Sequence, residues 1–216
     1  MKVLITGTSS GIGLAAAKLF LGIGHEVYGI DIADSEINND LYHHYKADIL
    51  SKDLPDIDGV EILVNCAGVQ TQSEADIDVN LKGTINVTEK YAFNHKIRSV
   101  LIVASASGTT GSEFKEYAAS KGGLIAYSKN VAKRLAPLNA VCNSLSPGGV
   151  VTSLNKHILY NDKLYEAVKN ETLLHKWASA EEIAEWIYFL TVVNKSATGI
   201  DVIVDNGEAI NYNFIW

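Results

Sequence analysis

The chain has 216 residues, of which 47% are hydrophobic and 20% are charged, and its formal net charge is −7 at pH 7. This composition excludes collagen-like, disordered and disulfide-dense chains, and it predicts one globular domain spanning residues 1–216. The negative charge without a Lys/Arg block, and the lack of an apolar run near the ~20 residues of a membrane helix, predict neither a nucleic-acid nor a membrane partner.

Short runs rich in Val, Ile and Leu alternate with helical stretches along the chain. The predicted strands are Lys2–Gly7, Glu26–Asp31, Tyr45–Ile49, Glu61–Gly68, Arg98–Ala106, Ala140–Gly148 and Asp201–Gly207. The predicted helices are Gly11–Leu21, Asp76–His95, Tyr117–Leu135 and Ala180–Val192, the last with Ser179 and Glu182 as a capping box. Strands that are apolar throughout are buried on both faces. The pattern predicts an α/β fold, a Rossmann-type doubly wound parallel sheet of about seven strands with helices on both faces.

A glycine-rich turn follows the first predicted strand and opens the first predicted helix. Such a turn lets the backbone approach a pyrophosphate, and the helix that follows presents free N–H groups to it. A lone glycine motif is weak evidence, but the strand–turn–helix context makes this one specific. The predicted cofactor contacts in the turn are Gly7, Ser9, Ser10, Gly11, Ile12 and Gly13.

The second predicted strand ends at Asp31, where a carboxylate accepts hydrogen bonds from the adenosine ribose hydroxyls. A 2′-phosphate would meet a like charge there. Thr8, Ser9 and Ser10 in the glycine turn offer no cation to receive it. We therefore predict NAD(H) in preference to NADP(H); an Asp that simply faces solvent at a strand end is the simpler alternative.

Tyr117 and Lys121 fall on one face of a predicted helix. A free phenol has a pKa of about 10, and a neighbouring ammonium lowers it, which makes Tyr117 a plausible general acid/base. Such a pair alone is usually surface decoration. Here Ser105 ends the fifth predicted strand and Asn80 is a polar residue within an apolar stretch. These points converge on the crevice where α/β sheets bind ligands.

Together the motifs resemble the short-chain dehydrogenase/reductase family, over nearly the whole chain from Met1 to about Gly207. The resemblance implies that Tyr117 is the general acid/base and that Ser105 orients the carbonyl. It implies that Lys121 lowers the tyrosine pKa and binds the nicotinamide ribose, and that Asn80 holds a water of a proton relay. The further cofactor contacts that it implies are Ile32, Asp48, Ile49, Asn65, Ala67, Gly68, Pro147, Gly148, Val150 and Thr152.

The chain departs from the family pattern in the region 32–64, which is compressed. Ser35–Leu41 has room for two helical turns, and Ser51–Asp58, with Pro55, for none. Ser107 is a second candidate for the carbonyl-orienting serine. The compression and the stretch Gly24–Ile32 also give a weaker resemblance to the bacterial 3α-hydroxysteroid/carbonyl reductases.

The expected function is NAD(H)-dependent interconversion of an alcohol and a carbonyl compound, with a small molecule as the substrate. An NAD-binding regulatory or scaffold protein without turnover is the alternative.

Residues 153–178 break the strand–helix alternation and are expected to form a substrate lid, or else an ordinary pair of covering helices. Their apolar residues, which favour an apolar or amphipathic substrate, are Leu154, Ile158, Leu159, Tyr160, Leu164, Leu173, Leu174 and Trp177. His157 and His175 are expected to be solvated.

The two cysteines, Cys66 and Cys142, lie in separate apolar runs without a Cys or His at metal-ligand spacing. They predict buried free thiols, a reducing compartment and no metal. The first apolar run ends at Gly7 and is too short for a secretory signal, so we expect a cytoplasmic protein. The apolar end, Tyr212–Trp216, predicts burial against another subunit in a homodimer or homotetramer.

Overall fold

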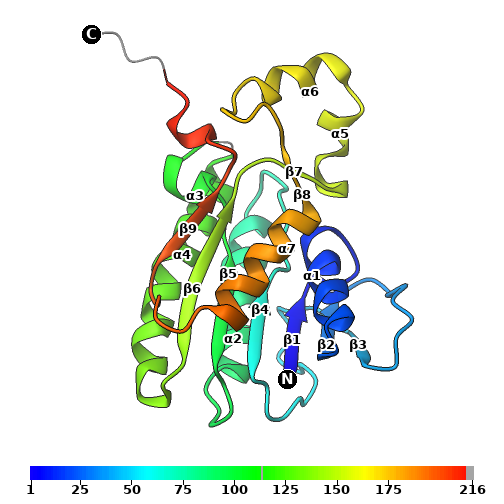
Figure 1. Ribbon diagram of the computed structural model, residues 1–216, viewed down its shortest axis with the longest axis vertical. Helices are drawn as coiled ribbons and strands as arrows, with labels where there is room; N and C mark the ends of the chain where they lie inside the picture. The colour runs from blue at the N-terminus through cyan, green and yellow to red at the C-terminus, as the bar shows by residue number, and fades with distance from the viewer. Residues whose placement is uncertain (113, 213–216) are drawn as a thin grey trace.

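Seven strands form one parallel sheet in the order β3-β2-β1-β4-β5-β6-β9, in a computed structural model that describes residues 1–112 and 114–212 (Figure 1). Every neighbouring pair is parallel. The strands are β1 (Lys2–Thr6), β2 (Glu26–Asp31), β3 (Tyr42–Lys46), β4 (Ile62–Asn65), β5 (Ser99–Val103), β6 (Val141–Pro147) and β9 (Asp201–Val204). The predicted doubly wound α/β fold is confirmed.

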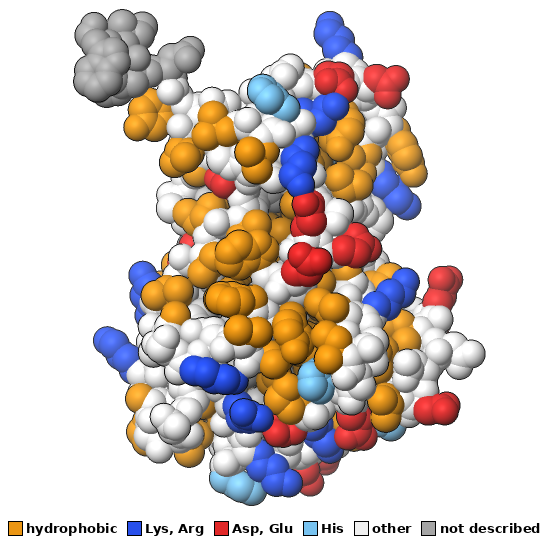
Figure 2. Space-filling view, viewed as in Figure 1, with side chains coloured by type: hydrophobic (Ala, Val, Ile, Leu, Met, Phe, Trp, Pro, Cys, Tyr) orange, Lys and Arg blue, Asp and Glu red, His pale blue; other side chains and the backbone are white. Residues whose placement is uncertain are grey.

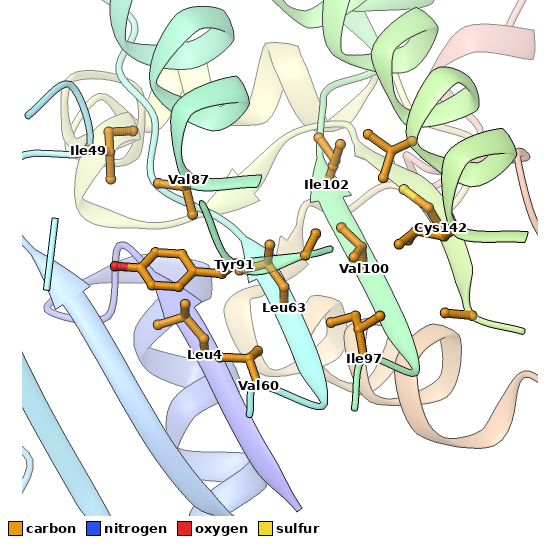
Figure 3. Packing of buried hydrophobic residues seen from close by; sticks show 14 of the residues in the cluster. Leu4, Ile49, Val60, Leu63, Val87, Tyr91, Ile97, Val100, Ile102 and Cys142 are labelled. Atoms are coloured by element: carbon orange, nitrogen blue, oxygen red, sulfur yellow. The ribbon is translucent and has the colours of Figure 1, made fainter. Parts of the chain in front are cut away.

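Helices cover both faces of the sheet because its strands are apolar on both sides. One core contains Leu4, Leu63 and Val100 beneath α2 (Thr84–Tyr91) and α4 (Lys115–Leu135) (Figure 3). The other contains Val3 and Ile5, the neighbours of Leu4 on β1, beneath α1 (Gly11–Gly22) and α7 (Ala180–Tyr188). Successive strand residues point to opposite faces, so a continuous apolar run supplies both cores.

Two of the helices contain π-helical segments. The predicted helix Asp76–His95 begins as the π-helix η1 (Asp76–Gly83), continues as α2 and ends at Tyr91. A second π-helical segment, η4 (Phe189–Val193), extends α7. The predicted capping box at the start of α7 is confirmed, since the Ser179 hydroxyl accepts from the Glu182 N–H and the Glu182 carboxylate accepts from the Ser179 N–H.

The compressed region differs from its prediction. The third strand runs over Tyr42–Lys46 and not Tyr45–Ile49. The Ala47 N–H still donates to the Asp31 carbonyl of β2 at 2.9 Å, and the chain then leaves the sheet because Asp48 organises a turn, in which its side chain accepts from the Leu50 N–H and its carbonyl from the Ser51 N–H. Residues 35–41 form no helix: Ser35 and Asn39 accept backbone N–H groups two residues on, a local bonding that competes with helical hydrogen bonds.

The two ends of the segment predicted as a lid lie next to each other. The short strands β7 (Val150–Val151) and β8 (Ala178–Ser179) pair at its base. Between them lie η3 (Ser153–Asn155), α5 (Lys156–Leu159) and α6 (Asp162–Lys169), above the carboxyl ends of the strands (Figure 1). The remaining short helices are α3 (Ser107–Thr110), η2 (Ala136–Leu138) and η5 (Glu208–Ile210).

The two cysteines differ in exposure. Cys142 is buried, as predicted, and Cys66 is half-buried as a residue, although its thiol group is desolvated. Loss of surrounding water raises the pKa of the Cys66 thiol to about 12, so it stays protonated at neutral pH.

Within residues 1–112 and 114–212, no group of three or more His, Cys, Asp and Glu side chains is placed to hold a metal ion. No helix in this part of the chain is both long and apolar enough to cross a membrane. Most of the apolar C-terminal segment, residues 213–216, lies outside the described residues, so its predicted burial stays a prediction.

Candidate active site

A cleft of about 1070 Å³ lies along the carboxyl ends of the strands. Its walls are the glycine turn after β1, the loops after β2, β4, β5 and β6, the start of α4, and the lid segment. This is the position at which parallel α/β sheets bind ligands, because the loops there diverge to the two faces of the sheet. The cleft is therefore where the predicted site residues should meet.

The glycine turn is shaped for close approach of a ligand to the backbone. Gly7 and Gly11 have φ values of +77° and +54°. A Cβ on Gly13 would lie 2.1 Å from the Gly7 carbonyl oxygen, and one on Gly7 would lie 2.9 Å from the Ala67 Cα. Ser10 has no side-chain capping bond, so the first N–H groups of α1 are left for a ligand.

Asp31 closes one end of the cleft and is held by backbone donors on both sides. Its Oδ2 accepts from the Ser9 N–H at 2.9 Å, and its Oδ1 accepts from the Ala33 N–H at 2.9 Å. A carboxylate oxygen has two lone pairs, so both oxygens can still accept from ribose hydroxyls. Next to it, Ile32 is 69% exposed and offers an apolar surface to a base.

The other half of the cleft holds the predicted chemical groups. The Lys121 ammonium is buried, donates to the Val103 carbonyl at 3.1 Å, and lies 5.6 Å from the centre of the Tyr117 ring. The Ser107 N–H donates to the Ser105 Oγ at 3.2 Å, and the Ser105 hydroxyl donates to that of Ser107, also at 3.2 Å. All four residues line the cleft. A cation, a phenol and two hydroxyls thus meet there, and the choice between the two serines stays open.

Asn80 lies behind this group and not in the cleft wall. It sits fully buried on η1, where its Oδ1 accepts from the Val69 N–H at 2.7 Å and its Nδ2 donates to the Val69 carbonyl at 2.9 Å. A Cβ on Gly68 would lie 3.0 Å from the Asn80 Oδ1 and 3.5 Å from the Lys121 Nζ. Asn80 therefore fixes the loop that separates it from Lys121.

Most of the predicted cofactor contacts lie together in the cleft wall, and two do not. Asn65 is buried behind the sheet edge, where its Nδ2 donates to the Thr88 Oγ1 at 3.0 Å. Ser9 does not line the cleft, but its N–H donates to Asp31 and its hydroxyl donates to the Ala33 carbonyl. The predicted residues that line the cleft are Gly7, Ser10, Gly11, Ile12, Gly13, Asp31, Ile32, Asp48, Ile49, Ala67, Gly68, Ser105, Tyr117, Lys121, Pro147, Gly148, Val150 and Thr152.

The cleft also contains residues that the sequence did not single out. Gln70 and Gln72 come from the loop after β4, Glu171 from the end of the lid, and Glu208 from the first turn after β9. Of the apolar lid residues, only Leu154, Ile158 and Trp177 line it, together with Val168 and the exposed His157. A helical pattern in the lid shows that it has an apolar face, but not which side chains point into the cleft.

Comparisons with known proteins agree with this arrangement. A family model described as "Enoyl-(Acyl carrier protein) reductase" matches residues 7–208. A 3-oxoacyl-(acyl-carrier-protein) reductase of Thermotoga maritima is 30% identical, over 96% of this chain and 97% of that protein.

Two solved structures resemble the whole chain. A 4-hydroxyisoleucine dehydrogenase in complex with NADH has a TM-score of 0.86 and 26% identity, over 96% of this chain and 98% of its own. An NADP-bound structure from Agrobacterium tumefaciens, described as a putative 2-deoxy-D-gluconate 3-dehydrogenase, has a TM-score of 0.88 and 24% identity. It covers 96% of this chain and 95% of its own, and at this identity it shows a shared fold only.

Proposed function

The chain belongs to the short-chain dehydrogenase/reductase family of oxidoreductases, and we propose that it interconverts an alcohol and a carbonyl compound by hydride transfer with NAD(H). The observation that carries the proposal is the meeting of Tyr117, Lys121 and Ser105 in the same cleft as the glycine turn and Asp31. A nicotinamide cofactor also accords with the NADH and NADP named for two structural neighbours.

The residues present fit a dinucleotide. Any side chain at Gly7 or Gly13 would collide with the backbone, so the turn keeps a surface that a pyrophosphate can approach. Asp31 would hold the adenosine ribose, and Thr152, which packs beside Gly11, would hold the carboxamide end. When bound, the nicotinamide ring supplies or accepts the hydride.

The chain's own residues then handle the proton and the orientation. The Ser105 hydroxyl holds the substrate oxygen, and the Tyr117 hydroxyl donates a proton to it in reduction or accepts one in oxidation. The Lys121 ammonium stabilises the phenolate that this transfer leaves. Asn80 holds the loop at Val69 in place beside Lys121. Lys121 in turn exchanges protons between Tyr117 and water.

We propose NAD(H) over NADP(H) because of the charges around Asp31. The two N–H donors orient this carboxylate, so a 2′-phosphate would meet a fixed negative charge. Lys46, the register partner of Asp31 on β3, already pairs with Asp34 at 3.0 Å.

Oxidation of NADH and of NADPH by a panel of ketones, aldehydes and quinones tests the function. We expect turnover with at least one carbonyl compound and a higher kcat/KM with NADH. Asp31→Ser should lower the NADH preference by about 10- to 100-fold, since hydrogen bonds to a charged group contribute about 1.5–3 kcal/mol. Asp40→Ser, an exposed change in the same region, is the control.

Two results would contradict this account in different ways. Tighter binding of NADPH than of NADH would overturn the cofactor preference alone. Saturable NADH binding with no turnover across the panel would favour the alternative function, a regulatory or scaffold protein that binds NAD.

We propose that residues 153–178 act as the substrate lid and that the substrate is amphipathic. Leu154, Ile158 and Trp177 give the substrate half an apolar wall, and Glu171 and Glu208 add carboxylates to it. This accords with the weaker resemblance to the 3α-hydroxysteroid/carbonyl reductases.

We also propose that two copies pair through α7 and β9. Of the large hydrophobic residues in the described chain that are exposed, several lie on α7, η4 and β9, and none lies on α2 or α4. Trp186 and Phe189 are 40% and 47% exposed and pack edge to face, and Ile203 on β9 is 41% exposed. Figure 2 shows hydrophobic side chains gathered over α7. A second copy would remove this surface from water.

Light scattering measures the pairing directly. The wild-type mass should equal two or four chains, and Trp186→Glu with Phe189→Glu should lower it, because carboxylates are costly to bury in an apolar interface. Leu138→Glu, which replaces a residue that is 41% exposed on η2, should leave the mass unchanged. A wild-type mass equal to one chain would overturn the pairing.

We propose that the protein works in the cytoplasm. Both cysteines are free, which is typical of a reducing compartment.

A further inference from the structure

The edge strand β3 carries the sequence Tyr42-His43-His44-Tyr45, whose side chains alternate between the two faces of the sheet. Tyr42 and His44 stack on each other, with ring centres 6.1 Å apart. His43 instead packs on Tyr28 and pairs with Glu26 at 3.0 Å. The motif therefore supplies two similar pairs of side chains, of which only one faces the glycine turn.

Tyr42 and His44 connect the glycine turn to the loop after β2. The Tyr42 hydroxyl lies 2.8 Å from the Thr8 Oγ1 and 3.2 Å from the His44 Nδ1. The His44 Nε2 donates to the Ala33 carbonyl at 3.0 Å. Thr8 is fully buried inside the glycine turn, so the contact joins the edge strand to the segment expected to bind the pyrophosphate.

These contacts close a ring around Asp31. The Ser9 hydroxyl donates to the same Ala33 carbonyl at 3.2 Å, and the N–H groups of Ser9 and Ala33 donate to the two carboxylate oxygens of Asp31. We call this set the Asp31 ring; its members are Thr8, Ser9, Asp31, Ala33, Tyr42 and His44.

The ring crosses β2 at a glycine. A Cβ on Gly29 would lie 2.3 Å from the Tyr42 hydroxyl oxygen and 2.5 Å from the Thr8 Oγ1. Any other residue at position 29 would therefore separate the two side chains. The hydrogen bond between Tyr42 and Thr8 depends on this gap in the strand.

The compressed region explains why such a ring is needed. Residues 32–41 contain no helix, so no helical hydrogen bonds hold the loop that follows Asp31. Ala33 is exposed, and the contacts that hold its N–H and its carbonyl come from Asp31, Ser9 and His44. Side chains of the edge strand thus take the supporting role of a helix.

We propose that Tyr42 and His44 are positioning residues for the adenosine half of the cofactor site, and that they act by holding Asp31 in the conformation that accepts ribose hydroxyls. The proposal rests on the proposed NAD(H) function and deepens it. Tyr42, His44 and Thr8 do not belong to the cleft wall, so they act on the cofactor through Asp31 and not by contact. Their loss should weaken binding of the adenosine half and spare the nicotinamide half.

Fluorescence titration with NADH and with reduced nicotinamide mononucleotide, which lacks the adenosine half, tests this. Tyr42→Phe and His44→Ala should each raise the Kd for NADH by about 2- to 12-fold, the equivalent of one net hydrogen bond of about 0.5–1.5 kcal/mol. The Kd for the mononucleotide and kcat at saturating NADH should not change. His44→Gln, whose amide can still donate to the Ala33 carbonyl, should recover part of the NADH affinity.

Tyr45→Phe and His43→Ala are the matched controls on the opposite face of β3, and they should leave both Kd values within about twofold of wild type. A double-mutant cycle separates positioning from general loss of stability. In an Asp31→Ser background, Tyr42→Phe should no longer change the Kd for NADH, because the residue through which it acts is gone.

An unchanged Kd for NADH in folded Tyr42→Phe and His44→Ala variants would overturn the proposal. So would an equal loss of affinity for NADH and for the mononucleotide, which would indicate a purely structural role. Failure of the wild-type protein to bind NADH would contradict the proposed function itself. That outcome differs from one in which wild type binds NADH and the variants bind it equally well, which contradicts only the proposed role of Tyr42 and His44.

Discussion

Tyr117→Phe is expected to lower kcat by about 10²- to 10⁴-fold while leaving the Kd for NADH unchanged, the range in which a positioned general acid/base contributes. The substitution removes one oxygen atom and keeps the ring that packs beside Lys121. The substrate oxygen would then lose its proton donor, although the cofactor could still bind. Stopped-flow turnover with the best carbonyl compound, alongside NADH titration, measures the two quantities separately.

Tyr127→Phe is the matched control for this change. Tyr127 lies on the same helix, α4, but its hydroxyl donates to Glu89 at 2.9 Å and it takes no part in the cleft wall. It should retain wild-type kcat. Wild-type turnover in the Tyr117→Phe variant on an authentic substrate would show that another group moves the proton.

Lys121→Met is expected to reduce kcat and NADH affinity together, with kcat falling by about 10²-fold or more. Methionine keeps most of the buried stem but removes the cation beside the Tyr117 ring. Alcohol oxidation should also need a higher pH, because the phenolate loses the positive charge that stabilises it. Lys121→Ala should have the same effects, with a larger loss of packing.

Thermal unfolding distinguishes the catalytic role of Lys121 from a structural one. Its ammonium also donates to the Val103 carbonyl, so some stability will be lost in either case. Lys129→Met, an exposed change on the same helix, should alter neither rate nor affinity. A Lys121→Met protein that loses stability but keeps kcat, affinity and pH profile would refute the role proposed for this residue.

The fold was predictable wherever its signals were local and aliphatic. Runs such as Lys2–Thr6 and Ser99–Val103 are buried on both faces, and the sequence shows this as unbroken hydrophobicity. The strand β3 was misplaced because Tyr-His-His-Tyr is aromatic and only half-buried, while the apolar Ile49 next to it packs against Gly83 from a turn. Edge strands lack the continuous apolar run on which the prediction depends.

The meeting of Ser105, Tyr117 and Lys121 in one cleft was predictable because these residues belong to short motifs with fixed spacing. The sequence could not show which members of a motif face the cleft. Asn65 turns away from it to bond Thr88 on α2, and Asn80 turns away to hold the loop at Val69, and only the tertiary packing of η1 and α2 reveals that. Glu171 and Glu208 were missed because neither belongs to a recognisable motif. Glu171 follows α6 in the lid and Glu208 follows β9, and only the folded chain brings these two segments to the cleft.

A crystal structure of the protein with NADH bound tests the central claim most directly. The account predicts that the hydroxyls of Tyr117 and Ser105 lie on one side of the nicotinamide, next to C4, with the ammonium of Lys121 at the adjoining ribose. It also predicts that Asp31 accepts hydrogen bonds from the adenosine ribose. A structure in which the Tyr117 oxygen points away from the nicotinamide into solvent would contradict the account.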